Sequence, residues 1–191
     1  MKQYAKIIHD TNFSGTIFVI TNPVDILAYS CYALTQTDNY ALRTYQVYGI
    51  GLEVDAARAV AYGHGLGLGL AMEDITLYGN HADTFVLDTP LDGELQHKLV
   101  EEVKGASASV RRYVPRTVYG PVAAAVKTLE AYAQDLSVHV TLLQEGTHIG
   151  RRVYFQFGLP MIKDAPTSKD YKNIVQYNGR AIAKYRHLLL E

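Results

Sequence analysis

Short apolar runs and amphipathic stretches alternate along the first 62 residues, which is the pattern of strands and helices taken in turn. The β-branched run at 16–21 has the length of a strand buried in a parallel sheet. Pro23 suits the first turn of the next helix, because the N–H that proline lacks would have no partner there. This part of the chain predicts the end of a helix at 2–10, the strand at 16–21, a helix from Pro23 to about Leu34, a strand at 45–48 and a helix at about 53–62.

The order of the elements changes after residue 62. Apolar segments at 75–78 and 84–87 predict neighbouring strands, and the segment around His81 separates them. The apolar stripe of a helix near the C-terminus consists of Tyr171, Ile174, Val175, Ile182, Tyr185 and Leu189. The second half of the chain predicts helices at 92–109 and 118–135, strands at 137–143 and 152–158, and this terminal helix with Ser168 as its N-cap.

We therefore expect an α+β fold in two parts, because strands in neighbouring pairs followed by runs of helix are typical of that class. We interpret residues 1–49 as the last αβαβ piece of a doubly wound sheet, and we expect the earlier strands of that sheet to be absent. Residues 50–191 are interpreted as an α+β domain. The nearest thing to a boundary between the parts is Gly49–Gly51.

Composition and charge narrow the class of partner. With 48% hydrophobic and 19% charged residues, the 191-residue chain has the composition of an ordinary globular protein. Its 18 basic and 19 acidic residues give a net charge of −1, so we expect neither nucleic acid nor an anionic membrane as a partner. The lone Cys31 excludes an intrachain disulfide, and the sequence has neither a signal peptide nor an apolar run of about 20 residues. We therefore expect a soluble, cytoplasmic protein.

Asp55 and Arg58 are the first candidates for chemistry. They are three residues apart on a predicted helix and therefore share one face. A surface ion pair would explain them and would contribute little to stability. However, the rest of this helix is almost entirely apolar, so we expect the pair to be desolvated, and desolvated charges need a specific partner or role.

His81 lies in a segment of small residues, Gly79-Asn80-His81-Ala82-Asp83-Thr84, directly after a predicted strand. Small neighbours let a substrate approach, and loops often carry reactive side chains. A histidine exchanges protons near neutral pH, and a buried carboxylate fixes its tautomer. We interpret His81 as an acid–base residue, Asp55 as its orienting carboxylate and Arg58 as the group that binds a substrate carboxylate. The six other histidines are interpreted as structural: His9, His64, His97, His139, His148 and His187.

Three further patterns carry less weight. Gly49-Ile50-Gly51 lies between a strand and a helix, as in a dinucleotide-binding loop, but Val54 replaces the third glycine. The alternating glycines of 63–70 fit neither that loop nor a P-loop, and we expect them to end a helix and form a flexible loop. His81 and Asp83 have no second cluster with metal-ligand spacing, so no metal site is predicted.

Three segments resemble the lactate/malate dehydrogenase family, nearer its L-lactate and L-2-hydroxyisocaproate branch. Asn22-Pro23-Val24-Asp25 and the strand before it resemble the family's strand and NPVD turn. Residues 47–58 (VYGIGLEVDAAR) resemble its G-x-G-x-x-L-D-x-x-R helix start, with Val54 where leucine is usual. Residues 79–84 (GNHADT) resemble its active-site segment GEHGDS, with changes at Asn80, Ala82 and Thr84. The resemblance is specific over 16–88 and continues more weakly to the C-terminus.

This resemblance implies a lactate dehydrogenase C-terminal-like catalytic domain, preceded by the last αβαβ piece of a Rossmann sheet. It implies NAD as cofactor and a small 2-oxo or 2-hydroxy acid as substrate, with His81 as the acid/base of hydride transfer and Asp55 as its partner. It also implies that Arg58, Asn22 and Thr117 bind the substrate, and that Asn22 and Val24 line the nicotinamide end of the cofactor site. The family's GxGxxG loop, its acidic ribose-binding residue and a mobile loop with a second arginine would precede Met1, so we expect most of the NAD-binding part to be missing.

Competing accounts of function stay open. In the first, the chain is the substrate-binding part of an NAD-dependent L-2-hydroxyacid dehydrogenase, and alone it binds NADH weakly and turns over slowly or not at all. In the second, it is a truncated, non-catalytic paralogue that acts in oligomer assembly, which the changes at Asn80, Ala82 and Pro115 favour. The resemblance implies a homo-oligomer, a dimer or tetramer, and helix 121–133 is a candidate contact. A third account, a metal-dependent hydrolase, depends on His81 and Asp83 alone.

Overall fold

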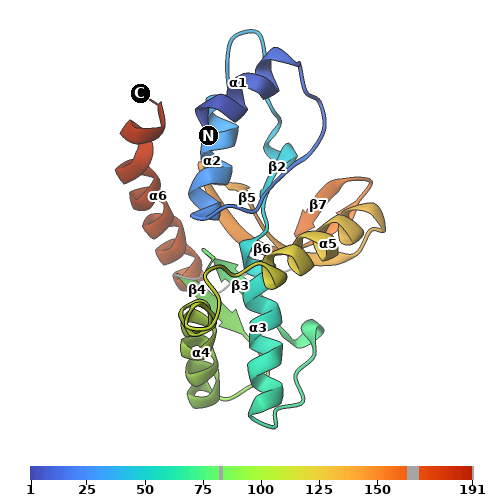
Figure 1. Ribbon diagram of the computed structural model, residues 1–191, viewed down its shortest axis with the longest axis vertical. Coiled ribbons are helices and arrows are strands. Elements are labelled where there is room, and N and C mark those ends of the chain that lie inside the picture. The colour runs from blue at the N-terminus through green and yellow to red at the C-terminus, as the bar shows by residue number, and fades with distance from the viewer. Residues whose placement is uncertain (82–83, 163–167, 191) are drawn as a thin grey trace.

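The computed structural model describes residues 1–81, 84–162 and 168–190, and the side chains of its last helix over 172–184. Within these residues, helices pack on both sides of one mixed sheet (Figure 1). The helices are α1 (Lys2–Asp10), α2 (Val24–Leu34), α3 (Gly51–Gly65), α4 (Gly93–Arg111), α5 (Tyr119–Ala133) and α6 (Ser168–Leu190). The strands are β1 (Ile17–Val19), β2 (Val47–Gly49), β3 (Thr76–Gly79), β4 (Phe85–Asp88), β5 (Ser137–Gln144), β6 (Thr147–Gln156) and β7 (Leu159–Ile162).

The strand order of the described sheet is β1-β2-β5-β6-β3-β4, and β7 pairs with β6. Strands β1 and β2 are parallel, as predicted, and the other described pairs are antiparallel. Strand β2 joins β5 through the single pair Gly49 and Thr141, so the parallel piece and the antiparallel piece share one sheet. The mixed sheet fits the predicted combination of the two pieces. The division into 1–49 and 50–191 stays a prediction.

Helix α3 is buried on most of its surface, which explains its apolar sequence. Leu52, Ala56 and Ala59 pack against β3, β4 and α4, and none of the three is exposed. Helices α3 and α4 lie side by side at the lower end of the molecule in Figure 1. Gly150 of β6 makes this packing possible, because a Cβ there would overlap the Leu52 side chain. The polar residues of α3 are therefore carried into the protein interior.

The other helices cover the remaining parts of the sheet. Helix α2 packs on β1 and β2 through Val24, Ala28 and Cys31. Helix α5 packs on β5 and β6, where Ala131 contacts the cluster around Phe155. Helix α6 packs on β3 and β6 through the buried Ile174, which belongs to its predicted stripe. Of the other stripe residues, Ile182 is also buried and Val175 is partly buried, while Tyr171, Tyr185 and Leu189 lie outside the described side chains.

The predicted order of helices and strands is confirmed, but one strand is missed and several ends shift. Strand β6 begins at Thr147 rather than at residue 152, and β7 follows it. Two-residue turns, Glu145-Gly146 and Phe157-Gly158, join these strands, and all four residues have positive φ. Such hairpin turns prefer Asn-Gly or Asp-Gly. Glutamate and phenylalanine therefore conceal both hairpins in the sequence.

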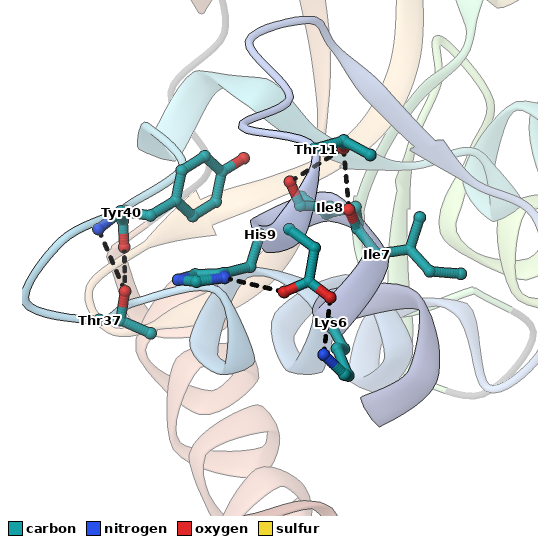
Figure 2. A network of polar contacts seen from close by, with 8 residues as sticks. Lys6, Ile7, Ile8, His9, Thr11, Thr37 and Tyr40 are labelled. Atoms are coloured by element: carbon teal, nitrogen blue, oxygen red, sulfur yellow. Dashed lines mark hydrogen bonds and ion pairs between the residues drawn. The ribbon is translucent and has the colours of Figure 1, made fainter.

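A polar network ends α1 and holds it near the loop after α2 (Figure 2). Thr11 Oγ1 donates to the carbonyl of Ile7 at 2.8 Å, and this bond gives a hydrogen-bond partner to one of the last carbonyl groups of the helix. The His9 ring meets the Tyr40 ring edge-on at 5.5 Å. The Thr37 hydroxyl donates to the Tyr40 carbonyl at 2.9 Å and accepts from the Tyr40 N–H at 3.1 Å, and these bonds close the loop. This network is structural and lies on elements that do not contribute to the cavity described below.

Candidate active site

His81 lies just after β3, where Gly79 turns the chain. Gly79 has a φ of 117°, and a Cβ there would overlap the carbonyl of Thr84. The Asn80 N–H donates to the same Thr84 carbonyl at 2.8 Å. A side chain at position 79 would therefore displace the chain next to the histidine. The glycine fixes the place from which the imidazole extends.

The imidazole of His81 meets the carboxylate of Asp55, as the sequence predicts. His81 Nδ1 lies 2.7 Å from Asp55 Oδ2. The His81 side chain is 10% exposed and that of Asp55 is not exposed at all. Because a carboxylate only accepts hydrogen bonds, Nδ1 is the donor, and Nε2 is left for proton exchange.

Arg58 completes the predicted set. Its Nη1 donates to Asp55 Oδ1 at 3.1 Å, so one carboxylate bridges the guanidinium and the imidazole. The Arg58 side chain is only 16% exposed. The alternative of a surface ion pair is therefore excluded, and the apolar sequence around the pair correctly predicts its desolvation. A guanidinium has five donors, so Arg58 keeps N–H groups for a second anion.

Asp25 contacts the backbone of the same histidine, a contact that its sequence pattern does not predict. Its Oδ2 accepts a hydrogen bond from the backbone N–H of His81 at 3.0 Å. The residue lies in the first turn of α2 and is buried. Burial raises the pKa of Asp25 from 3.8 to about 6, although the hydrogen bond from His81 opposes this rise. The signal available in the sequence was the acidic residue at the start of an otherwise apolar helix.

The glycines at 49 and 51 have a local structural purpose. A Cβ at residue 51 would overlap the ring of His81, and a Cβ at residue 49 would overlap the hydroxyl of Thr141. The two glycines therefore allow the Thr141 hydroxyl and the His81 ring to approach the start of α3 closely. That the Gly-x-Gly pattern is not a dinucleotide-binding loop stays a prediction.

A small cavity of about 30 Å³ brings four predicted residues together. Asn22, Arg58, His81 and Thr117 line it, from the segments before α2 and α5, from α3 and from the loop after β3. Its remaining lining residues are Ile20, Ile50, Gly51, Val54, Ser107 and Pro121. An imidazole, a guanidinium, an amide and hydroxyls within an apolar wall suit a small molecule with one carboxylate and one oxygen that exchanges a proton.

The structure does not bring every other candidate residue to the cavity. Val24 is 1% exposed and packs in the core with Val47, so its side chain is not brought to the cavity. Ser107 of α4 lines the cavity, but nothing in the helical pattern distinguishes it from its neighbours. Asp83, the second residue of the metal alternative, lies outside the described residues. No group of three or more His, Cys, Asp or Glu side chains that could hold a metal is found among the residues that are described.

A second buried charge cluster also involves α3. Glu53 is 1% exposed, and its carboxylate lies 2.6 Å from Lys127 Nζ. The backbone N–H of His139 donates to Glu53 Oε2 at 2.9 Å, and His139 Nδ1 lies 3.1 Å from the same oxygen. Burial alone would raise the pKa of Glu53, but the hydrogen bonds of His139 and Lys127 hold it below its usual value. The sequence analysis missed this cluster, although Glu53 lies in the same apolar helix as Asp55.

His148 behaves as a structural histidine, as predicted. It is 1% exposed, and its Nε2 lies 3.3 Å from the carbonyl of Val47. Burial lowers the pKa of His148 to about 4, so the ring is neutral over most of the pH range. The side-chain amide of Asn178 donates to the His148 carbonyl at 3.0 Å, which ties α6 to β6.

A groove of about 950 Å³ adjoins the cavity between α3 and α5. It shares Val54, Arg58, Thr117 and Pro121 with the cavity. Large apolar side chains that line this groove are exposed at the end of α4 and before α5: Val110, Tyr113, Val114 and Val118. No helix in the described residues is both long and apolar enough to cross a lipid bilayer.

Sequence comparison identifies one relative of known type. No family model matches the chain. The chain is 26% identical to L-lactate dehydrogenase 1 of Clostridium acetobutylicum over 182 aligned residues, which cover 83% of this chain and 56% of that protein. The chain thus spans about half the length of the curated relative it matches, and it corresponds to the C-terminal part.

Solved structures share the fold over nearly the whole chain. The malate dehydrogenase from Aeropyrum pernix has a TM-score of 0.78 and 19% identity, and the match covers 96% of this chain and 67% of that one. The malate dehydrogenase from Archaeoglobus fulgidus, solved in complex with NADH, has a TM-score of 0.79 and 18% identity over 96% and 66%. MGS-M5, a lactate dehydrogenase from a Medee basin deep-sea metagenome library, has a TM-score of 0.80 and 18% identity over 100% and 68%.

Proposed function

We propose that the chain belongs to the lactate/malate dehydrogenase family and that it carries the substrate-binding site of an NAD-dependent L-2-hydroxyacid dehydrogenase. The observation that carries this proposal is the buried Arg58–Asp55–His81 arrangement on one small cavity. Its chemistry matches a 2-oxo acid, which has one carboxylate to bind and one keto oxygen to protonate.

The three side chains have separate roles in this proposal. Arg58 binds the substrate carboxylate through N–H groups that Asp55 does not use. His81 gives a proton from Nε2 to the keto oxygen during reduction and takes it back during oxidation. Asp55 holds the tautomer and stabilises the imidazolium, without itself exchanging the proton. Asn22 and Thr117, which also line the cavity, hydrogen-bond the substrate.

The residues of this chain fit the nicotinamide end of NAD. The half-exposed Ile20 and the amide of Asn22 lie at the cavity that His81 also lines. When bound, NAD supplies the hydride in one direction and accepts it in the other. The apolar wall of Ile50, Val54 and Pro121 limits the access of water to the reacting oxygen.

Binding of pyruvate to the purified chain tests this proposal without requiring turnover. We expect pyruvate to shift the NMR signals of His81 and Arg58, and an R58L variant to lose that response. Arg43, an exposed arginine on the loop before β2, provides the matched control R43L, which should respond as the parent does. If pyruvate does not perturb His81 at any concentration, or if R58L responds unchanged, the proposed function is wrong.

A titration of NADH fluorescence addresses the cofactor separately. We expect the chain alone to bind NADH only weakly, because its residues would contact one end of the dinucleotide. Micromolar affinity would show that this chain holds a larger part of the cofactor site.

An assembly role is supported by a different observation. Val118, Val122, Val126 and Leu129 form a stripe along α5, and each is about half exposed. Exposed apolar stripes of this kind are typical of protein contacts. We propose that the chain forms homo-oligomers through this face of α5, and that the same face serves the alternative of a non-catalytic assembly subunit.

A further inference from the structure

The backbone of His81 is held by a buried carboxylate. Asp25 belongs to α2, while His81 follows β3, and the hydrogen bond between them spans 56 positions in the sequence. Asp25 is 8% exposed and is not part of the cavity lining, so it is separated from the substrate. A carboxylate buried beside apolar side chains is costly, which calls for a purpose at this position.

The neighbours of Asp25 connect it with the site and not with solvent. The backbone N–H of His81 is its hydrogen-bond donor, the charge of Asp55 acts on it, and the hydroxyl of Thr141 from β5 approaches the same carboxyl group. Thr141 in turn fills the space above Gly49, and the His81 ring fills the space above Gly51. The carboxylate therefore lies under the histidine, at the joint of α2, β5 and the loop after β3.

We propose that Asp25 is a positioning residue, which fixes the backbone of residue 81 so that the imidazole stays between Asp55 and the cavity. This inference rests on the proposed acid–base role of His81. Two helices therefore position His81: α3 orients its ring through Asp55, and α2 holds its main chain through Asp25. Both oxygens of a carboxylate accept hydrogen bonds, so either can pair with the N–H of residue 81, whereas an asparagine side chain has one accepting and one donating end. The charge of the carboxylate also strengthens the bond relative to a neutral acceptor.

The turn before α2 gives the same inference a geometric consequence. Asn22 lines the cavity, and Asp25 lies three residues further along the chain. A single short segment therefore contributes one wall of the cavity and the anchor of the histidine. The distance between the amide at 22 and the imidazole at 81 is set through the Asp25 bond.

NMR of the intact chain tests the anchor directly. We expect the carboxyl carbon of Asp25 and the backbone amide of His81 to follow one titration curve with a midpoint near pH 6. In D25N the amide oxygen still accepts the bond, so the His81 amide should lose this titration step and keep its slow hydrogen exchange. In D25A, exchange of the His81 amide should accelerate at least tenfold. D38N, at an exposed aspartate in the loop after α2, should change neither measurement.

Pyruvate then separates this inference from the proposed function. We expect the pyruvate response of the His81 ring to be retained in D25N and weakened at least tenfold in D25A. If the parent chain does not bind pyruvate, the proposed function fails, while the amide titration still decides whether Asp25 anchors residue 81. Because the His81 ring can titrate as well, the step that counts is the one whose midpoint matches that of the Asp25 carboxyl carbon in the parent. The inference is overturned if the His81 amide keeps this matched step in D25N, or if D25A retains slow exchange. If D25A does not fold, D25N alone decides through the loss or retention of the matched step.

Discussion

Replacing Asp25 by asparagine should make the protein more stable at neutral pH, although Asp25 makes a good hydrogen bond. The substitution keeps the size of the side chain and an oxygen that can accept from the His81 N–H. It removes only the negative charge, which is buried beneath the histidine. The variant therefore isolates the free energy of keeping that charge inside the fold.

The magnitude follows from the pKa of Asp25, which burial raises from 3.8 to about 6. The folded state holds the Asp25 proton more tightly than the unfolded state. The contribution of Asp25 to the free energy of unfolding is therefore fully present below pH 3.8 and is lost as the pH rises through about 6. One pH unit corresponds to about 1.4 kcal/mol, so the loss amounts to about 3 kcal/mol at pH 8. An amide imitates the protonated carboxyl only in part, and we expect D25N to be about 1–3 kcal/mol more stable than the parent at that pH.

Urea denaturation at several pH values measures this difference. The gap between D25N and the parent should be largest at pH 8, shrink through pH 6 and vanish near pH 3.5, because groups common to both proteins cancel. In thermal unfolding, a chain of this size should gain roughly 2–4 °C for each kcal/mol. A D25N variant that is less stable at pH 8, or a gap that does not change with pH, would refute the reasoning.

The remaining predictions concern three other positions. Burial lowers the pKa of His148 to about 4, so its contribution to the free energy of unfolding is fully present above pH 6.5 and is lost as the pH falls through 4. In urea denaturation, the free energy of unfolding of H148Q should therefore fall less steeply with decreasing pH than that of the parent. An equally steep fall would contradict this prediction. G51A should cost about 1–3 kcal/mol and abolish the pyruvate response of the imidazole, because a Cβ overlaps the ring, whereas G105A, which meets open space on α4, should add about 0.5–1 kcal/mol. Equal behaviour of the two glycine variants in these assays would disprove the steric argument. V122K on α5 should reduce the oligomer mass in light scattering, while I7K at a similarly exposed site on α1 should not; an unaffected V122K oligomer would exclude that face.

The contact between the His81 ring and Asp55 could be predicted because each residue is marked by its own neighbours in the sequence. Asp55 and Arg58 share a helix face, and their apolar neighbours indicate burial before any coordinates are known. His81 was recognised by its small neighbours and by the resemblance of its segment to a known active site. The meeting of all three follows because α3 begins next to the loop that carries the histidine.

Contacts made by the main chain could not be predicted from the sequence. The bond from Asp25 reaches a backbone N–H, and every residue except proline offers one, so no residue type marks the partner. The role of Val24 as a cofactor contact was carried over from a motif, but the α2 helix turns that side chain into the core. The turns Glu145-Gly146 and Phe157-Gly158 escaped for a similar reason, since their backbone angles are imposed by the paired strands and not by the residues themselves.

The bridging carboxylate at position 55 has a consequence for how this site can vary. Imidazole and guanidinium rely on one common counter-charge, so their substitutions should show epistasis instead of adding independently. Losing the guanidinium removes one partner of the Asp55 carboxylate, and we expect the carboxylate then to hold the imidazole differently. A substitution of Arg58 should therefore also change how the His81 imidazole is held, so we expect residues 58 and 81 to change together in evolution.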